Sequence, residues 1–265
     1  MTDNIHLDCI SSREMRQVSK DTLQQYNNLF SNVTANYRTG HMSASLLDDT
    51  RNKIGTAIGI DEEKSIHFTS GPEESANWAI KGLAWKFAKK RKQFLFSETE
   101  STRIRNPLNW LRKHEFGSEP IKILSNESII LDYENLKEKL DDRVTAVCIE
   151  FANSELGFVN NIKDAVEIVN DYSPSAKIIC DLSTHIGRGL LNVDELGIDF
   201  GIIDSQSFGG PSGSGALYIN PNLRIENLIH GDHSEFGKRA GTQNVSAISA
   251  MGAAAQEMSA NLGDE

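Results

Sequence analysis

Cysteine, positive charge and long apolar runs are all scarce in this chain of 265 residues. Its three cysteines, Cys9, Cys148 and Cys180, are odd in number and far apart, which argues against a disulfide framework or a cysteine-ligated metal cluster. Lys and Arg total 27 against 37 Asp and Glu, a net charge of −10, and this balance argues against a surface that binds nucleic acid or anionic lipid. The longest uncharged run, Ala240–Gln256, is too short and too polar to span a bilayer.

A secretory signal pattern is also missing, because no basic segment followed by an apolar one opens the chain. Few cysteines and no signal pattern together predict a cytoplasmic protein in a reducing compartment. The composition, with 38% apolar and 24% charged residues, is typical of a folded globular chain.

Short apolar and β-branched runs alternate with amphipathic segments that have helical spacing. The expected strands are Ser65–Thr69, Gln93–Phe96, Ile121–Leu124, Thr145–Phe151, Lys177–Cys180, Phe200–Ile203 and Ala216–Ile219. The expected helices are Leu46–Ile58, Glu74–Lys89, Arg105–His114, Tyr133–Leu140, Ile162–Asn170 and Val245–Asn261. This alternation predicts an α/β fold with a mostly parallel sheet between layers of helices. Ligands of such folds bind where loops follow the carboxyl ends of strands, here the loops 70–74, 98–103, 151–157, 181–188 and 204–215.

No linker, internal repeat or low-complexity tract divides the chain, so we expect a single domain over residues 1–265 with a core at roughly 5–258. The last expected helix runs into Gly263-Asp264-Glu265, which suggests that a further segment once followed it. The small residues Gly252 to Ala255 in that helix permit close packing, either inside the core or against another subunit.

Generic motifs predict little chemistry. The Gly209–Gly215 run lacks the Gly-Lys-Ser/Thr ending of a P-loop and precedes a strand, so we interpret it as a turn. His230 and His233 have no evident third ligand, so we expect no metal site. A Gly-x-Ser-x-Gly nucleophile motif is missing, and Cys148 and Cys180 lie in apolar runs where cysteines are usually buried and inert.

Six motifs in order resemble those of the cysteine desulfurases, which are class V aminotransferases and pyridoxal-phosphate enzymes of fold type I. The run Phe68-Thr69-Ser70-Gly71-Pro72-Glu73-Glu74-Ser75-Ala76-Asn77 is similar to their Phe-Thr-Ser-Gly-Ala-Thr-Glu-Ser-x-Asn. The others are Thr99-Glu100-Ser101, Ala152-Asn153-Ser154-Glu155-Leu156-Gly157, Cys180-Asp181-Leu182-Ser183-Thr184, Gly213-Ser214-Gly215-Ala216-Leu217-Tyr218 and Arg239-Ala240-Gly241-Thr242. The resemblance implies the large domain of a fold type I enzyme, without the small C-terminal domain that carries the persulfide-forming cysteine.

The resemblance fails at the residue that matters most for catalysis. In the family, a lysine that forms the Schiff base with the cofactor follows a Ser-Gly-His run, and the matching position here is Ser207. No lysine lies between Lys177 and Lys238, so a small shift in the alignment does not restore one. Since serine cannot form an imine, we assign no catalytic residue and expect no bound cofactor.

The positions that would contact the phosphate are also altered. Pro72 and Glu73 stand at the start of the helix that cradles the phosphate in the family, with Glu73 in place of a threonine. Asp204 stands where a serine hydroxyl is expected. A carboxylate about 4 Å from a phosphate charge costs on the order of 4 kcal/mol at an effective dielectric of about 20, more than the roughly 0.3–2 kcal/mol that a helix N-terminus contributes.

Most of the positions that would contact the cofactor ring also carry residues other than those of the family. Ser101 replaces the histidine that stacks on the ring, and Ser154, Thr184 and Gln206 replace other contacts. Asp181, which holds the ring nitrogen in the family, and Thr242, which reaches the phosphate bound by a partner subunit, are retained. Asp181 can equally cap the turn after its strand. We therefore regard this set as a vestigial pocket.

These changes leave three hypotheses open. The first is a catalytically inactive, regulatory or binding protein that forms a homodimer, or a heterodimer with a related desulfurase. The second is an enzyme with a repurposed acidic pocket in which Glu73, Asp181, His185 and Asp204 converge. The third is the pyridoxal-phosphate-binding half of a split cysteine desulfurase in sulfur transfer or iron–sulfur assembly, with Lys238 of a neighbouring subunit as the nearest lysine.

Overall fold

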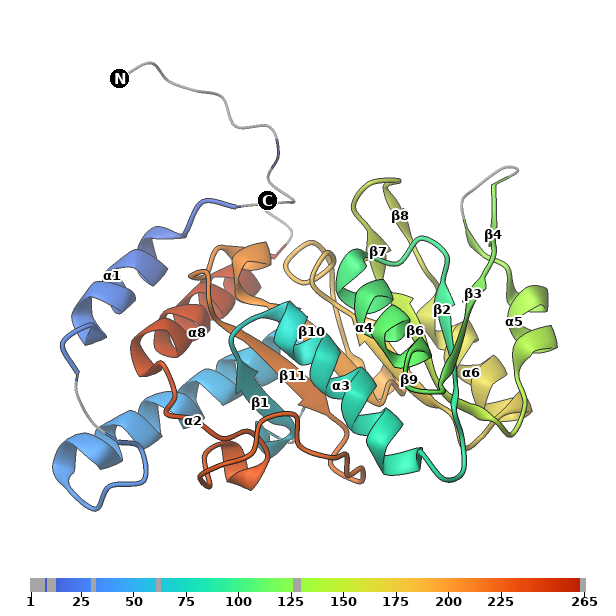
Figure 1. The fold of residues 1–265 in the computed structure, drawn as a ribbon. Helices are drawn as coiled ribbons and strands as arrows, with labels where there is room; N and C mark the ends of the chain where they lie inside the picture. Colours follow the sequence, from blue (N-terminus) through green and yellow to red (C-terminus); the bar gives the residue numbers. More distant parts are fainter. Residues whose placement is uncertain (1–7, 9–12, 30–31, 61–62, 126–129, 263–265) are drawn as a thin grey trace.

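The computed structural model describes Asp8 and residues 13–29, 32–60, 63–125 and 130–262. In this part of the chain, seven strands form one sheet (Figure 1). Across the sheet their order is β1 (Ile66–Thr69), β11 (Gly215–Ile219), β10 (Phe200–Asp204), β9 (Lys177–Asp181), β6 (Val144–Glu150), β2 (Gln93–Ser97) and β3 (Gly117–Ile121). Strand β11 runs antiparallel to both of its neighbours, and every other adjacent pair is parallel. The expectation of a mostly parallel sheet is therefore confirmed.

Helices cover both faces of this sheet, as the alternating pattern predicts. One face packs against α3 (Pro72–Phe87) and α4 (Thr102–Arg112), with Trp78 and Leu108 fully buried. The other packs against α2 (Arg38–Ile58), α5 (Tyr133–Lys139), α6 (Ile162–Tyr172) and α8 (Val245–Ala260). Figure 1 shows α3 and α4 in front of the sheet and the group of α1 (Gln17–Tyr26), α2 and α8 at one end. Across the described ranges, no helix has the length and apolarity needed to cross a bilayer.

The remaining elements are short. They are α7 (Val193–Leu196), the hairpin strands β4 (Ile123–Leu124), β5 (Ile130–Leu131), β7 (Ala152–Asn153) and β8 (Phe158–Val159), and the 3-10 turns Glu63–Ser65, Ser205–Phe208 and Glu235–Gly237. The turn Ser205–Phe208 and the glycine-rich run join the antiparallel strands β10 and β11, so the interpretation of Gly209–Gly215 as part of a turn is confirmed. Gly215 lies so close to Gly71 that a Cβ atom would sit 2.8 Å from its Cα.

The strand predicted at Ile121–Leu124 is placed too late in the sequence. The edge strand of the sheet is Gly117–Ile121, and Ile123 and Leu124 belong to the separate β4–β5 hairpin. The misleading feature is Pro120, which argues against a central strand but is compatible with an edge, where one side of the backbone has no partner. Helix α1 and the first eight residues of α2 were not predicted, because their sequences are polar and lack a continuous apolar stripe.

The small residues of α8 pack inside the molecule. Gly252 faces α2 so closely that a Cβ atom would lie 2.7 Å from the Thr50 hydroxyl. Ser19 of α1 donates a hydrogen bond of 3.0 Å to the Ala250 carbonyl on another side of the same helix. Close packing between α8, α2 and α1 therefore accounts for the Gly252 to Ala255 run. Cys148 and Cys180 are buried as expected, and Cys9 lies outside the described residues.

Candidate functional site

Three neighbouring strands each end in an acidic residue at the same edge of the sheet. Glu150 is the last residue of β6, Asp181 of β9 and Asp204 of β10. Because the three strands are parallel and adjacent, their carboxyl ends meet, and Glu150 pairs in register with Asp181. This edge is the one at which ligands of open α/β sheets bind.

A cavity of about 320 Å³ opens at this edge. All of the described residues that line it carry a hydroxyl, a carboxylate or a guanidinium group: Ser101, Arg103, Glu150, Ser154, Asp181, Ser183, Thr184, Arg188, Asp204 and Ser207. The structure thus brings six of the predicted pocket positions together, namely Ser101, Ser154, Asp181, Thr184, Asp204 and Ser207.

Arg103, in the first turn of α4, connects the acidic groups of the cavity. Its Nη1 lies 3.3 Å from Asp181 Oδ2 and 3.1 Å from the Ser183 hydroxyl, while its Nε lies 3.8 Å from Glu73 Oε1. The guanidinium therefore lies between Asp181 and Glu73. Asp181 Oδ1 accepts a hydrogen bond from the Ser183 amide, so both of its oxygens are paired inside the protein. Burial opposes the charge of Arg103, yet its pKa is raised by the acidic groups around it, Asp181 foremost.

Burial leaves two lining carboxylates poorly stabilised. It raises the pKa of Asp204, although a hydrogen bond from the Gln206 backbone N–H and the charge of Arg103 act in the opposite direction. It also raises the pKa of Glu150, although Thr99 and Asn153 donate hydrogen bonds of 2.7 and 2.8 Å to its Oε1. Carboxylates outnumber the cations that could compensate them, which is why arginine pairing does not fully offset the cost of burial.

Glu100 lies behind the cavity and is 2% exposed. The backbone amides of Glu150 and Ser101 lie near its carboxyl and favour the ionised form, but neither reaches full hydrogen-bonding geometry. Burial, followed by the charges of Glu150 and Asp181, raises its pKa well above the usual range. The Ser101 hydroxyl, which lines the cavity, is buried without a hydrogen-bond partner among the described residues.

Ser207, at the expected lysine position, is one turn beyond the end of β10. Its hydroxyl donates a hydrogen bond of 2.7 Å to the Asp204 carbonyl, and the side chain lines the cavity. The side chain of the neighbouring Gln206 does not line the cavity, and its backbone N–H donates to Asp204 Oδ1 at 3.1 Å. A short polar side chain thus stands at the position where the resemblance would place the amine.

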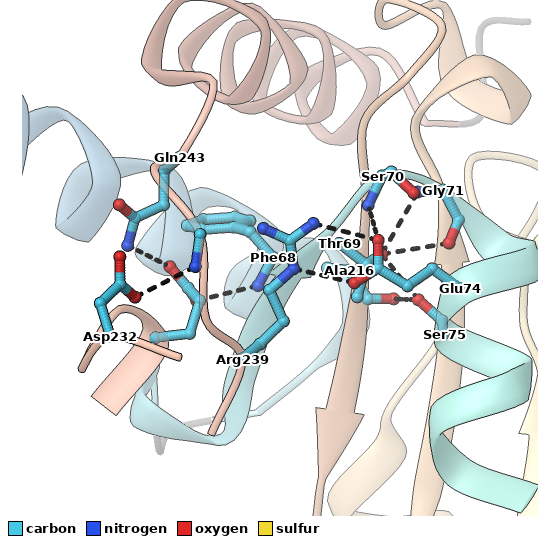
Figure 2. A network of polar contacts seen from close by, with 12 residues as sticks. Phe68, Thr69, Ser70, Gly71, Glu74, Ser75, Ala216, Asp232, Arg239 and Gln243 are labelled. Carbon is cyan, nitrogen blue, oxygen red and sulfur yellow. Dashed lines mark hydrogen bonds and ion pairs between the residues drawn. The ribbon is translucent and has the colours of Figure 1, made fainter. Parts of the chain in front are cut away.

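A second polar network holds the start of α3 against the Arg-Ala-Gly-Thr loop (Figure 2). Arg239 donates to both oxygens of Glu74, at 2.8 and 3.1 Å, and the Ser70 amide donates to Glu74 Oε2 at 2.8 Å. The Ser75 hydroxyl lies 2.8 Å from that of Thr69 and donates to the Ala216 carbonyl at 3.1 Å. Two of the resemblance motifs, more than 160 residues apart, therefore meet in one closed arrangement.

Other predicted residues lie outside the cavity. Pro72 is buried at the first position of α3, where proline is well tolerated. Glu73 is exposed beside it, and its carboxylate lies 3.8 Å from Arg103 Nε. Thr242 is exposed on its loop. His185 does not converge with the carboxylates, because its ring stacks on Phe151 at a centroid distance of 4.1 Å. The convergence proposed for the repurposed pocket is therefore wrong for this histidine.

Lys238 also lies apart from the cavity of its own chain. Its Nζ is 3.4 Å from His67 Nε2, and burial lowers its pKa, with a smaller effect from the charge of Arg224. His67 is buried between Trp78 and Phe236, and burial lowers its pKa to about 3. The neutral imidazole can accept a hydrogen bond from the lysine.

Four lining residues were missed in the sequence: Arg103, Glu150, Ser183 and Arg188. Arg103, Ser183 and Arg188 lie in the loops that the strand pattern marks for inspection, but none stands at a position with a role in the resemblance. Glu150 falls in an expected strand, one residue before a marked loop. An acidic residue near the end of an otherwise apolar run was the available signal for it.

Comparison with known proteins agrees with this architecture. The family model described as aminotransferase class-V matches residues 9–264. The cysteine desulfurase IscS of Dictyoglomus turgidum is 32% identical over 255 residues, which are 96% of this chain and 64% of that protein. The IscS of Methanosarcina thermophila is 33% identical over 233 residues, 88% of this chain and 56% of that protein. The chain thus spans less than two thirds of the length of these relatives.

Solved structures show the same fold. A NifS-like protein superimposes with a TM-score of 0.93 at 24% identity, covering 98% of this chain and 71% of the other. A NifS-like protein from Rickettsia africae gives a TM-score of 0.86 at 27% identity, covering 98% and 70%. Motif order, fold and family match agree, and the chain belongs to the class V aminotransferase family, among relatives named cysteine desulfurases.

Proposed function

We propose that this chain is a non-catalytic member of its family that acts as a binding or regulatory subunit, as a homodimer or paired with a related desulfurase. The observation that carries the proposal is the Arg103 guanidinium, held by Asp181 and facing Glu73. In the family, an aspartate at the Asp181 position pairs with the pyridine nitrogen of the cofactor. In this chain Asp181 pairs with the Arg103 guanidinium instead.

The residues around the cavity do not fit pyridoxal phosphate. Among the described lining residues there is no aromatic or apolar side chain against which its ring could stack. Asp204 and Glu73 place negative charge where a phosphate dianion would need hydroxyl groups and free amides. Ser207 has no amine with which the aldehyde could react. Each of these features alone would weaken binding of the cofactor, and they act together.

The proposal is tested by adding pyridoxal phosphate to the purified chain and recording visible absorbance before and after borohydride, with intact mass of the product. We expect neither a new band nor a covalent adduct. The Ser207→Lys variant supplies the missing amine, and we expect no stable band from it either, because Arg103, Glu73 and Asp204 remain. A reduced adduct on the unaltered chain would overturn the proposal and direct attention to Lys238.

The partner role is tested separately by light scattering after gel filtration, for the chain alone and mixed with a cysteine desulfurase. We expect a dimer, either of the chain with itself or with the desulfurase. A monomer in both samples would contradict the subunit role. Cysteine-dependent sulfide release from a mixture of this chain with a separate chain that supplies the small cysteine-bearing domain, but from neither chain alone, would instead support the split-desulfurase hypothesis.

A further inference from the structure

We propose that the cavity at the carboxyl ends of β6, β9 and β10 binds a small organic cation that carries a primary ammonium group. This inference goes beyond the proposed subunit role and does not depend on it, because it concerns the cavity of one chain. It follows from the charge balance of the cavity, from the hydrogen-bonding capacity left open there, and from the size and polarity of the space.

The charge balance favours a cation. Glu150, Asp181 and Asp204 line the cavity. The exposed Glu73 adds a fourth carboxylate, 3.8 Å from Arg103 Nε. The two cations that face them are Arg103 and Arg188. Arg103 is committed to Asp181, Ser183 and Glu73, while Arg188 donates to the Thr184 carbonyl at 2.7 Å. Carboxylates remain in excess, so a bound cation lowers the electrostatic cost and a bound anion raises it.

The open hydrogen-bonding positions are acceptors. Glu150 is bonded through Oε1 and Asp204 through Oδ1, and among the described residues neither second oxygen receives a hydrogen bond. The Ser101 hydroxyl is buried at the cavity wall without a hydrogen-bond partner among the described residues. An unpartnered buried polar group needs an explanation, and a ligand is one. An ammonium group offers three donors, enough for both carboxylates and one hydroxyl.

The space restricts the class of ligand further. A volume of about 320 Å³ is large compared with the roughly 30 Å³ that one water molecule takes up in the liquid, so a molecule of several heavy atoms has room. The polar lining offers no surface for a ring or a long alkyl chain. Within the described ranges, no three acidic, histidine or cysteine side chains are grouped so as to hold a metal ion. A compact aliphatic amine fits these conditions.

Calorimetric titration of the full chain with three probes of equal chain length tests the inference. The probes are putrescine, butanediol and succinate, which carry positive, neutral and negative ends. We expect saturable binding of putrescine and neither of the other two. No binding of putrescine at millimolar concentration, or equal binding of butanediol, would overturn the proposal.

Two variants locate the site. Glu150→Gln and Asp204→Asn each replace a charged acceptor by a neutral one of similar shape, and we expect each to weaken putrescine binding by about tenfold. Glu167→Gln, on the exposed face of α6, makes the same charge change away from the cavity and should leave the affinity unchanged. Using two independent cavity variants guards against a folding defect in one of them. If neither weakens binding, or if the α6 control weakens it equally, the cavity is not the site.

Discussion

Two buried polar regions of this molecule differ in how completely their charges are paired. In the loop network around Glu235, the carboxylate accepts from Arg51 at 3.0 Å, from the Phe68 amide at 2.9 Å and from Gln243 at 3.0 Å. In the cavity at the strand ends, by contrast, Glu150 and Asp204 each have one oxygen without a partner among the described residues. The two regions thus use the same residue types with opposite results.

The difference separates structural from functional polar groups. A carboxylate that is fully hydrogen-bonded and ion-paired holds two loops together, so its removal should mainly reduce stability. A carboxylate that is partly or fully buried and underpaired reduces stability, which makes it a candidate for a role in binding. Removing the charge of a carboxylate should therefore change the free energy of unfolding in opposite directions in the two regions.

The largest loss of stability is expected for Glu235→Ala. The Glu235 side chain is fully buried and that of Arg51 is 6% exposed, so the variant leaves a buried guanidinium with Asp48 and the rings of Phe68 and Phe236. Breaking such a buried pair costs about 3–5 kcal/mol. Urea unfolding followed by circular dichroism measures the loss. The matched control is Asp49→Asn, which breaks the exposed i,i+4 pair with Lys53 and should cost less than about 0.5 kcal/mol. Equal losses for both would remove the distinction drawn here.

A smaller loss, about 1–3 kcal/mol, is expected for Arg103→Ala. The variant removes the guanidinium from Asp181 and Ser183 and leaves a buried carboxylate without its cation. The same urea titration at neutral pH gives the value. Arg105→Ala, on an exposed position of the same helix, serves as control. If Arg103→Ala is as stable as the parent, Arg103 does not hold the cavity together.

The smallest change, and one of opposite sign, is expected for Asp204→Asn. Burial raises the pKa of Asp204 in the folded state, so ionising this carboxyl destabilises the folded protein. The parent therefore loses stability as pH rises through that pKa. The amide removes this cost, so the variant should be more stable at pH 7 by about 1 kcal/mol or less. Below the pKa of the unfolded carboxyl, near 3.8, the advantage should disappear. Unfolding curves at pH 7 and at pH 3.5 measure both; an advantage that is independent of pH would mean that charge is not the cause.

Much of the fold could be predicted from local pattern. The strands that became β1, β6, β9, β10 and β11 read as apolar runs because they are buried in the sheet, and α3 and α6 as amphipathic stripes because one face is covered. The edge was harder, since Gly117–Ile121 has exposed residues and a proline. Helix α1 was missed because its contact with α8 includes Ser19, a buried polar residue that breaks the apolar pattern.

The candidate site divides in the same way. Ser101, Asp181, Asp204 and Ser207 could be located because motif order and strand ends identify positions along the chain. Arg103 could not, since nothing in a sequence states which of several arginines on a helix turns toward an aspartate 78 residues away. The position of His185 against Phe151 was equally inaccessible, because ring stacking depends on how two loops pack.

The residues themselves determined the chemistry that is possible: an alternating α/β pattern, a net negative charge, and a serine where an amine would be needed. These follow from composition and order along the chain. Only the tertiary structure decided that Arg103 pairs with Asp181, that the Glu235 carboxylate is fully paired, and that Glu150 and Asp204 are not. Pairing depends on distances of a few ångströms between groups far apart in sequence. Those distances are set by the packing of helices on the sheet.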